Sequence, residues 1–171
     1  MVRWLAIGLI VIIGLVGCAA VPFGEPTAQK KPAPVMLVNN ASQPETFTVG
    51  VVEESANLTV HRQDGDIANY APGPGSTTIY TTSNNKFVKI EFPESATLHG
   101  EYTLQPGEEK LINVSGVAPD EAIVVLVYDE EDGTYRAIKS LSCGGAILGY
   151  RITSQAGGSD DWTMSTHSCS H

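Results

Sequence analysis

The chain has 171 residues, and its 10 Lys and Arg against 19 Asp and Glu give a formal net charge of −9. This acidic balance argues against a nucleic-acid binder, which needs a basic face to meet phosphates. Hydrophobic residues make up 42% and charged residues 17%, which excludes disorder over the whole chain. The 17 Gly and 10 Pro, together with many Val and Thr, favour β structure.

The first residues have the pattern of an export signal. Arg3 is the only charged residue before Glu25, and residues 4–16 are apolar or glycine. A membrane-spanning helix needs about 20 apolar residues, so this run is too short to span comfortably. A positive start followed by a short apolar run is typical of a secretory signal, and we expect residues 1–17 to be the signal peptide.

The apolar run ends in Leu15-Val16-Gly17-Cys18, which resembles the lipobox of prokaryotic lipoproteins. The resemblance implies that Cys18 is lipidated and becomes the first mature residue. Two acyl chains anchor a protein stably, whereas one chain binds a membrane only marginally. We therefore expect a lipid-anchored protein on the extracytoplasmic face of the cell membrane. The alternative is an ordinary cleaved signal or a short membrane helix, with an incidental cysteine.

A proline-rich tether is expected at residues 18–34, which contain Pro22, Pro26, Pro32 and Pro34. Proline-rich chains are extended and semi-rigid, so this segment would hold the rest of the protein clear of the membrane. We expect the folded domain to occupy residues 35–171.

From Val35 onward the apolar residues repeat with a period of two, which is typical of β-strands. Residues 122–128 are almost continuously apolar, as expected of a central strand that is covered on both faces. Many short strands separated by turn residues predict an all-β sandwich or barrel. The expected strands are residues 46–51, 57–61, 87–92, 111–114, 122–128, 134–141, 147–153 and 162–168.

Two local patterns resemble extracellular immunoglobulin-like domains. They are Val38-Asn39-Asn40-Ala41-Ser42 before residues 46–49, and Leu104-Gln105-Pro106-Gly107-Glu108 before residues 111–114. Residues 37–143, including His99 to Leu104 and the apolar residues 123–128, resemble small exported lipoproteins of halophilic archaea. The resemblance implies an immunoglobulin-like antiparallel β-sandwich and carries no catalytic motif.

With Cys18 lipidated, Cys143 and Cys169 are left as a pair in an exported domain, where disulfides persist. We expect them to form one disulfide that holds the last strand. Antiparallel pairing of residues 147–153 with residues 162–168 would bring the two cysteines toward the same end of the sheet. Free thiols or a metal site are the alternatives.

A copper site is the main competing interpretation of the C-terminus. Met164, His167, Cys169 and His171 are ligand types for copper. Their order does not match the ligand loop of the cupredoxin class, and a disulfide would remove the best ligand. We expect no bound metal and no cofactor.

Two further patterns have simple interpretations. Residues 129–133, Asp-Glu-Glu-Asp-Gly, are expected to form a solvated hairpin turn rather than a calcium loop. Asn40, Asn57 and Asn113 each begin an N-glycosylation sequon, and they are candidate glycosylation sites.

The sequence contains no Gly-x-Ser-x-Gly, no His-Glu-x-x-His and no glycine-rich phosphate loop, so we expect no enzyme activity. The anchor, the tether and the β domain together predict a binding or structural module of the cell envelope. Its expected partners are the membrane, through the lipid, and an envelope protein or a glycan. A copper-binding electron carrier or metal chaperone is the alternative function.

Overall fold

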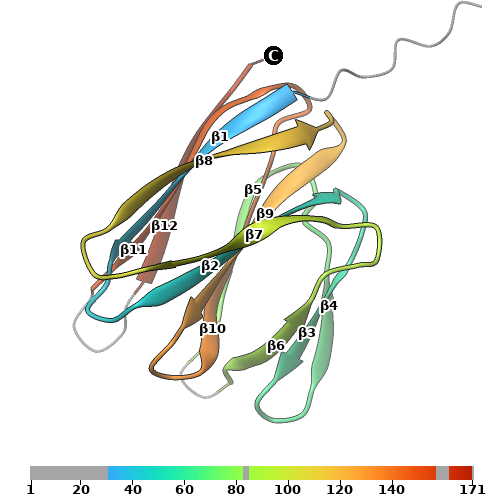
Figure 1. The fold of residues 1–171 in the computed structure, drawn as a ribbon. Coiled ribbons are helices and arrows are strands. Elements are labelled where there is room, and N and C mark those ends of the chain that lie inside the picture. Colours follow the sequence, from blue (N-terminus) through green and yellow to red (C-terminus); the bar gives the residue numbers. More distant parts are fainter. Residues whose placement is uncertain (1–30, 83–84, 157–161, 171) are drawn as a thin grey trace, which may run out of the picture.

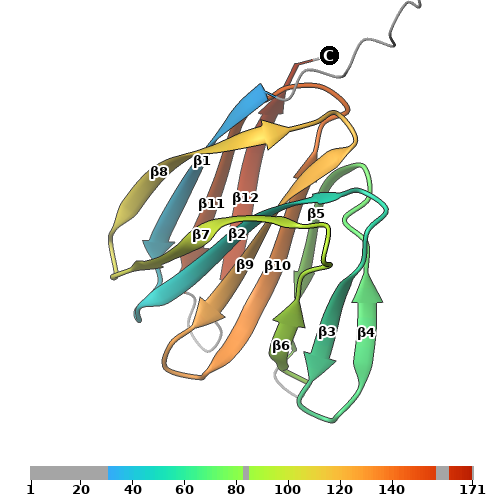
Figure 2. The same ribbon diagram turned by 45° about the vertical axis from the view of Figure 1, so that its right-hand side comes forward.

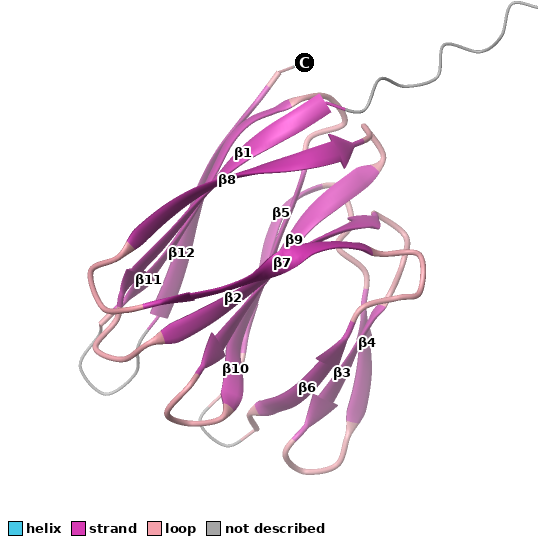
Figure 3. Ribbon diagram, in the orientation of Figure 1, coloured by secondary structure: helices cyan, strands magenta, loops and turns pink. Residues whose placement is uncertain are grey.

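The computed structural model describes residues 31–82, 85–156 and 162–170, and these residues are almost entirely strands and turns (Figure 1; Figure 3). The described strands are β1 (Lys31–Asn40), β2 (Glu45–Glu53), β3 (Leu58–Arg62), β4 (Ile67–Tyr70), β5 (Gly75–Tyr80), β6 (Phe87–Glu91), β7 (Thr97–Leu104), β8 (Glu109–Val117), β9 (Glu121–Asp129), β10 (Thr134–Ser142), β11 (Ile147–Gln155) and β12 (Trp162–Cys169). Within this part of the chain, no helix is long and apolar enough to cross a membrane.

The strands form two sheets that face each other (Figure 2). Sheet A has the order β12-β11-β1-β8, and sheet B has the order β4-β3-β6-β10-β9-β2-β7, with β5 also paired to β10. This arrangement confirms the predicted all-β sandwich of the immunoglobulin-like, antiparallel class. One strand pair differs from that pattern, because β1 and β11 run parallel.

The folded domain begins earlier than the sequence predicted. β1 starts at Lys31, so residues 31–34, which were assigned to the tether, belong to a strand. Ala33 is fully buried against the sandwich core. Pairing with β11 begins only at Val35, so the start of β1 pairs with β8 alone. This stretch is therefore an edge, where Pro32 and Pro34 are tolerated in a strand despite their missing N–H groups.

The main core fills the space between the two sheets. Alternate residues of β1, β2 and β9 point into it, and Phe47 and Tyr150 are its largest fully buried side chains. The other members include Val35, Leu37, Val49, Val51, Val114, Ile123, Val125, Val127, Leu141 and Ile152.

A second core lies on the opposite face of sheet B. β10 pairs with β6 only at Tyr135, and the rest of that edge pairs with β5, so β6, β3 and β4 diverge from the sandwich. They cover the outer face of β2, β9 and β10, and Val60 and Phe87 pack there against Val124 and Leu126. Residues of β9 therefore enter both cores, which confirms the prediction of a strand buried on both faces.

The expected strands do not include β1, although a period of two was expected from Val35 onward. The sequence analysis also missed β4, β5 and β7. Each carries few buried residues, because β4 and β7 lie at the two edges of sheet B and β5 pairs only with β10. A strand with only one or two side chains in contact with a core lacks the alternating pattern by which a strand is recognised.

Lys139 connects the two sheets by hydrogen bonds along one edge of the sandwich. It lies on β10 between Ala137 and Leu141 on the core face, and it is 1% exposed. Its Nζ donates hydrogen bonds to the carbonyl oxygen of Thr163 on β12 at 2.6 Å and to Thr78 Oγ1 on β5 at 3.0 Å. The Tyr80 hydroxyl, 3.2 Å from the same Nζ, donates to the same Thr163 carbonyl oxygen.

These contacts hold a buried amine among neutral hydrogen-bonding groups. Burial lowers the pKa of Lys139 from 10.5 to about 8. The unfolded chain therefore binds more protons than the folded chain between these two values. It follows that the contribution of Lys139 to stability rises as the pH increases through this range.

We expect the thermal midpoint of the wild type to rise relative to that of Lys139→Met between about pH 7 and about pH 9.5, because the buried charge is lost there. Thermal unfolding of both chains at the two pH values measures this difference. Lys89→Met is the matched control, since the Lys89 side chain is 62% exposed. Equal pH dependence of the wild type and Lys139→Met would contradict the assignment.

Candidate binding site

A pocket of about 350 Å³ opens on the outer face of sheet B, at one end of the second core. It lies where the chain leaves β6 and runs through residues 92–96 to β7. Its walls combine five strands, β2, β6, β7, β9 and β10, with this connecting segment. The lining residues are Thr48, Ile90, Phe92, Pro93, Ala96, Leu98, Glu101, Leu126 and Tyr135.

Gly50 of β2 lets two of these walls approach the sheet. A Cβ atom at Gly50 would lie 2.8 Å from Phe92 Cε1 and 3.2 Å from Leu98 Cδ2. The first distance is shorter than real contacts of a Cβ atom, so any side chain at Gly50 must push the Phe92 ring away. The absence of a side chain at position 50 therefore sets the shape of the pocket.

The polar groups of the pocket gather on one side. Thr48 Oγ1 donates a hydrogen bond to Glu101 Oε1 at 3.4 Å, across the pairing of β2 with β7. Burial, and then the nearby Glu101 carboxylate, raise the pKa of Tyr135 above its ordinary value, so its phenol is a neutral hydrogen-bonding group at this side of the pocket. Among the described residues that line the pocket, Glu101 is the only one with a charge at neutral pH.

A second carboxylate lies on the same sheet face beyond the pocket. Thr46 Oγ1 donates to Glu130 Oε1 and shares a 2.7 Å hydrogen bond with Thr103 Oγ1. Tyr128 packs edge-on against Tyr135, with 5.1 Å between the ring centroids. The face therefore runs from an apolar pocket to a polar, acidic strip.

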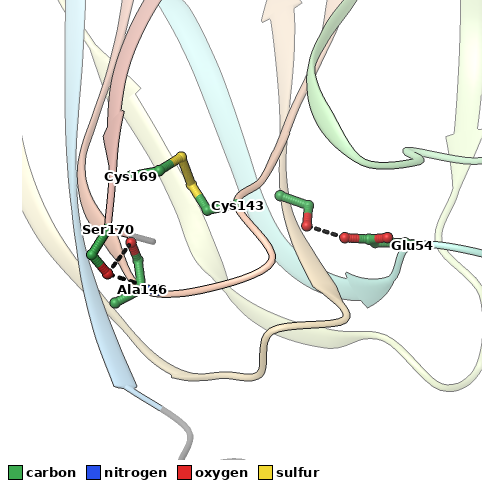
Figure 4. Close-up of a disulfide and its surroundings, with 6 residues drawn as sticks. Glu54, Cys143, Ala146, Cys169 and Ser170 are labelled. Atoms are coloured by element: carbon green, nitrogen blue, oxygen red, sulfur yellow. Dashed lines mark hydrogen bonds between the residues drawn. A yellow bond between two sulfur atoms is a disulfide. The ribbon is translucent and has the colours of Figure 1, made fainter.

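The predicted disulfide is present between Cys143 and Cys169, with 5.6 Å between their Cα atoms (Figure 4). Cys143 directly follows β10 of sheet B, and Cys169 ends β12 of sheet A. The bond therefore joins the two sheets, in addition to holding the last strand. Beyond it, Ser170 continues the pairing, because its N–H donates to the Ala146 carbonyl oxygen at 2.9 Å.

A second hollow, of about 510 Å³, lies beside the disulfide. Glu54, Asp120, Ser142 and His167 line it together with both cysteines. The Ser142 hydroxyl donates directly to the Glu54 carboxylate (Figure 4). In a Ser-His-Asp triad an imidazole stands between the serine and the carboxylate, so this direct serine–carboxylate contact is not a triad.

The structure does not assemble the candidate copper ligands. Cys169 is in the disulfide, and His171 lies outside the described residues. Met164 and His167 are three residues apart on β12, so they point to opposite faces of sheet A. In the described ranges, no group of three or more His, Cys, Asp and Glu side chains could hold a metal ion.

The acidic turn after β9 is less solvated than predicted. Asp129 is 2% exposed, and its Oδ1 accepts the backbone N–H groups of Glu131 at 2.8 Å and Asp132 at 3.1 Å. Its Oδ2 pairs with Arg136, whose Nε lies 3.2 Å from Oε1 of the buried Glu45. Asp129 is therefore part of a buried ion-pair cluster, whereas the residues at 130–132 are exposed as expected.

The remaining predicted site residues are placed as follows. Asn40, Asn57 and Asn113 are all exposed, so each is accessible for glycosylation. Cys18 lies outside the described residues, and its lipidation stays a prediction.

Comparison with known proteins yields no family: no protein-family model matches the chain, and no curated protein matches it significantly. The site must therefore be interpreted from its own residues. The sequence analysis did not single out the pocket, because its residues come from five separate strands and a connecting segment. The sequence feature that came closest to indicating the pocket was the apolar strand around Leu126, because the outward-facing side chains of that strand had to be buried by a further layer of structure.

We expect reduction of the disulfide to lower the free energy of unfolding by about 3–4 kcal/mol, because it releases the loop between residues separated by 26 positions. Denaturant unfolding of the full chain, with and without reductant, measures the loss. Cys143→Ser with Cys169→Ser should give the same loss and should become insensitive to reductant. Two free thiols at these positions in the denatured, unreduced chain would contradict the bond.

Proposed function

We propose that this protein is a lipid-anchored binding module of the cell envelope, with the pocket on sheet B as its binding site. The observation that carries the proposal is that pocket: apolar walls with a few polar groups on one side are typical of binding sites. The proposed location is the extracytoplasmic face of the cell membrane, and the proposed partner is another envelope component.

The anchor is supported by the lipobox-like Leu15-Val16-Gly17-Cys18. An acidic domain is repelled by an anionic membrane surface, so electrostatics alone would not hold it there. Disulfide Cys143–Cys169 is consistent with an oxidising compartment outside the cytoplasm.

The position of the pocket suits a tethered binder. The chain enters the domain at Lys31 of β1, in sheet A. The pocket opens on the outer face of sheet B, on the far side of the sandwich from sheet A. A domain held through β1 therefore keeps this face available to a partner.

We expect Cys18→Ala to lose the lipid and to accumulate as an uncleaved precursor or in the medium, because the thiol is the site of attachment. Metabolic labelling with a lipid precursor, followed by membrane fractionation, measures both effects. Cys143→Ser with Cys169→Ser is the control and should stay on the membrane. Absence of label on the wild type would refute the anchor.

We expect a photo-reactive amino acid at Leu98 to cross-link an envelope component in intact cells, and the same residue at Leu111 not to do so. Both side chains are 59% exposed, but Leu98 lines the pocket and Leu111 lies on β8 of sheet A. Gly50→Ala should reduce the cross-link at position 98 by displacing Phe92. Equal cross-linking at both positions would refute the pocket as the binding site.

A further inference from the structure

We propose that the pocket binds an extended, basic segment of a partner protein, with one apolar side chain in the pocket and a lysine or arginine against Glu101. This inference rests on the proposed function and names the ligand class of the same site. Its motif is an apolar residue, any residue and a basic residue.

The apolar part of the motif follows from the walls. Ile90, Phe92 and Leu126 are aliphatic or aromatic and belong to the second core or pack against it, and Leu98 adds an exposed aliphatic side chain. A volume of about 350 Å³ is at the low end of the range for ligand sites. It suits one large apolar side chain rather than a whole cofactor.

The basic part of the motif follows from charge. Glu101 is exposed, and among the described lining residues it alone is charged at neutral pH. Glu130 adds a second carboxylate on the same face, where Thr46 donates to it. The whole chain carries a formal charge of −9, which steers a basic partner toward the domain.

An extended conformation follows from the position of β7. This strand is at the edge of sheet B, so a ligand reaches Leu98 and Glu101 without displacing a neighbouring strand. In an extended peptide, residues i and i+2 point to the same side, about 7 Å apart. One of them can enter the pocket while the other meets the carboxylate.

A glycan fits these walls less well. Sugars present hydroxyl groups on every side and need several polar partners, whereas the described lining residues offer only the side chains of Thr48, Glu101 and Tyr135. The Thr48 hydroxyl is already bonded to Glu101. A neutral oligosaccharide also gains nothing from the charge of Glu101.

The test titrates the full chain in detergent micelles with three blocked peptides. They are Ser-Leu-Ser-Lys-Ser, Ser-Leu-Ser-Glu-Ser and Ser-Ser-Ser-Lys-Ser. NMR follows binding through the methyl signals of residues that line the pocket, namely Ile90, Ala96, Leu98 and Leu126. Only the first peptide should shift these signals strongly. The Glu peptide should bind about three- to fivefold more weakly, because an exposed ion pair contributes up to about fivefold in affinity. The peptide without Leu should bind at least about threefold more weakly, because it buries no apolar side chain in the pocket. Added salt should reduce the difference between the Lys and Glu peptides.

Two variants locate the interaction. Glu101→Gln should remove the preference for Lys over Glu, whereas Glu53→Gln, an exposed glutamate at the end of β2, should preserve it. Gly50→Ala should weaken binding by moving Phe92, whereas Gly149→Ala in sheet A should not, because its Cβ would meet only Ser168 Oγ, at 3.3 Å.

The outcomes separate the two proposals. Equal binding of all three peptides, or an unchanged preference in Glu101→Gln, would overturn the basic motif. Pocket shifts with maltotriose but with none of the peptides would overturn the peptide class and leave the pocket as the binding site. No shift with any probe, together with no specific cross-link at position 98, would overturn both.

Discussion

The burial of β9 on both faces is the constraint on which the rest of the structure depends. Residues 122–127 are at most 2% exposed, and they alternate between the two cores. A single sandwich covers only one face of each sheet, so the outward face of β9 needs a further layer. The hairpin of β3 and β4, together with β6, supplies that layer by leaving the edge of β10 (Figure 2). The pocket lies where this second layer ends and β7 begins.

A second constraint acts on the last strand. β12 is the edge of sheet A, and a terminal edge strand would fray unless other contacts held it. Lys139 and Tyr80 bind the backbone of Thr163 near the start of β12, and the disulfide binds Cys169 at its end. Both the hydrogen bonds and the disulfide connect β12 to residues of sheet B or directly after it, so they join the two sheets along one side of the sandwich. Burial of Lys139 among neutral partners disfavours its charged form, which is why the pKa of Lys139 is lowered.

The two sides of the domain then have different properties. Sheet A carries the entry of the chain at Lys31 and the fastened terminus, whereas sheet B carries the pocket and its acidic strip. This separation is the physical basis of the proposed function, because a tether at one side leaves the other accessible. Gly50 links the fold to the site: the same position that pairs in the centre of β2 also admits the Phe92 ring that shapes the pocket.

The sequence by itself determined the features that depend on local pattern. Alternation predicted the well-buried strands, the apolar run predicted β9, and the count of cysteines predicted the disulfide. Tertiary structure alone decided the features that depend on partners distant in the chain. Proline composition suggested a tether through Pro34, yet pairing with β8 made residues 31–34 a strand. Acidic composition suggested a solvated turn, yet Arg136 and Glu45 bury Asp129. The weakly patterned strands β4, β5 and β7 form because their neighbours supply the hydrogen bonds, and the pocket exists only once β7 meets the connecting segment after β6. The spacing of residues along the chain does not reveal such long-range contacts, because they depend on which strands become neighbours in the folded sheet.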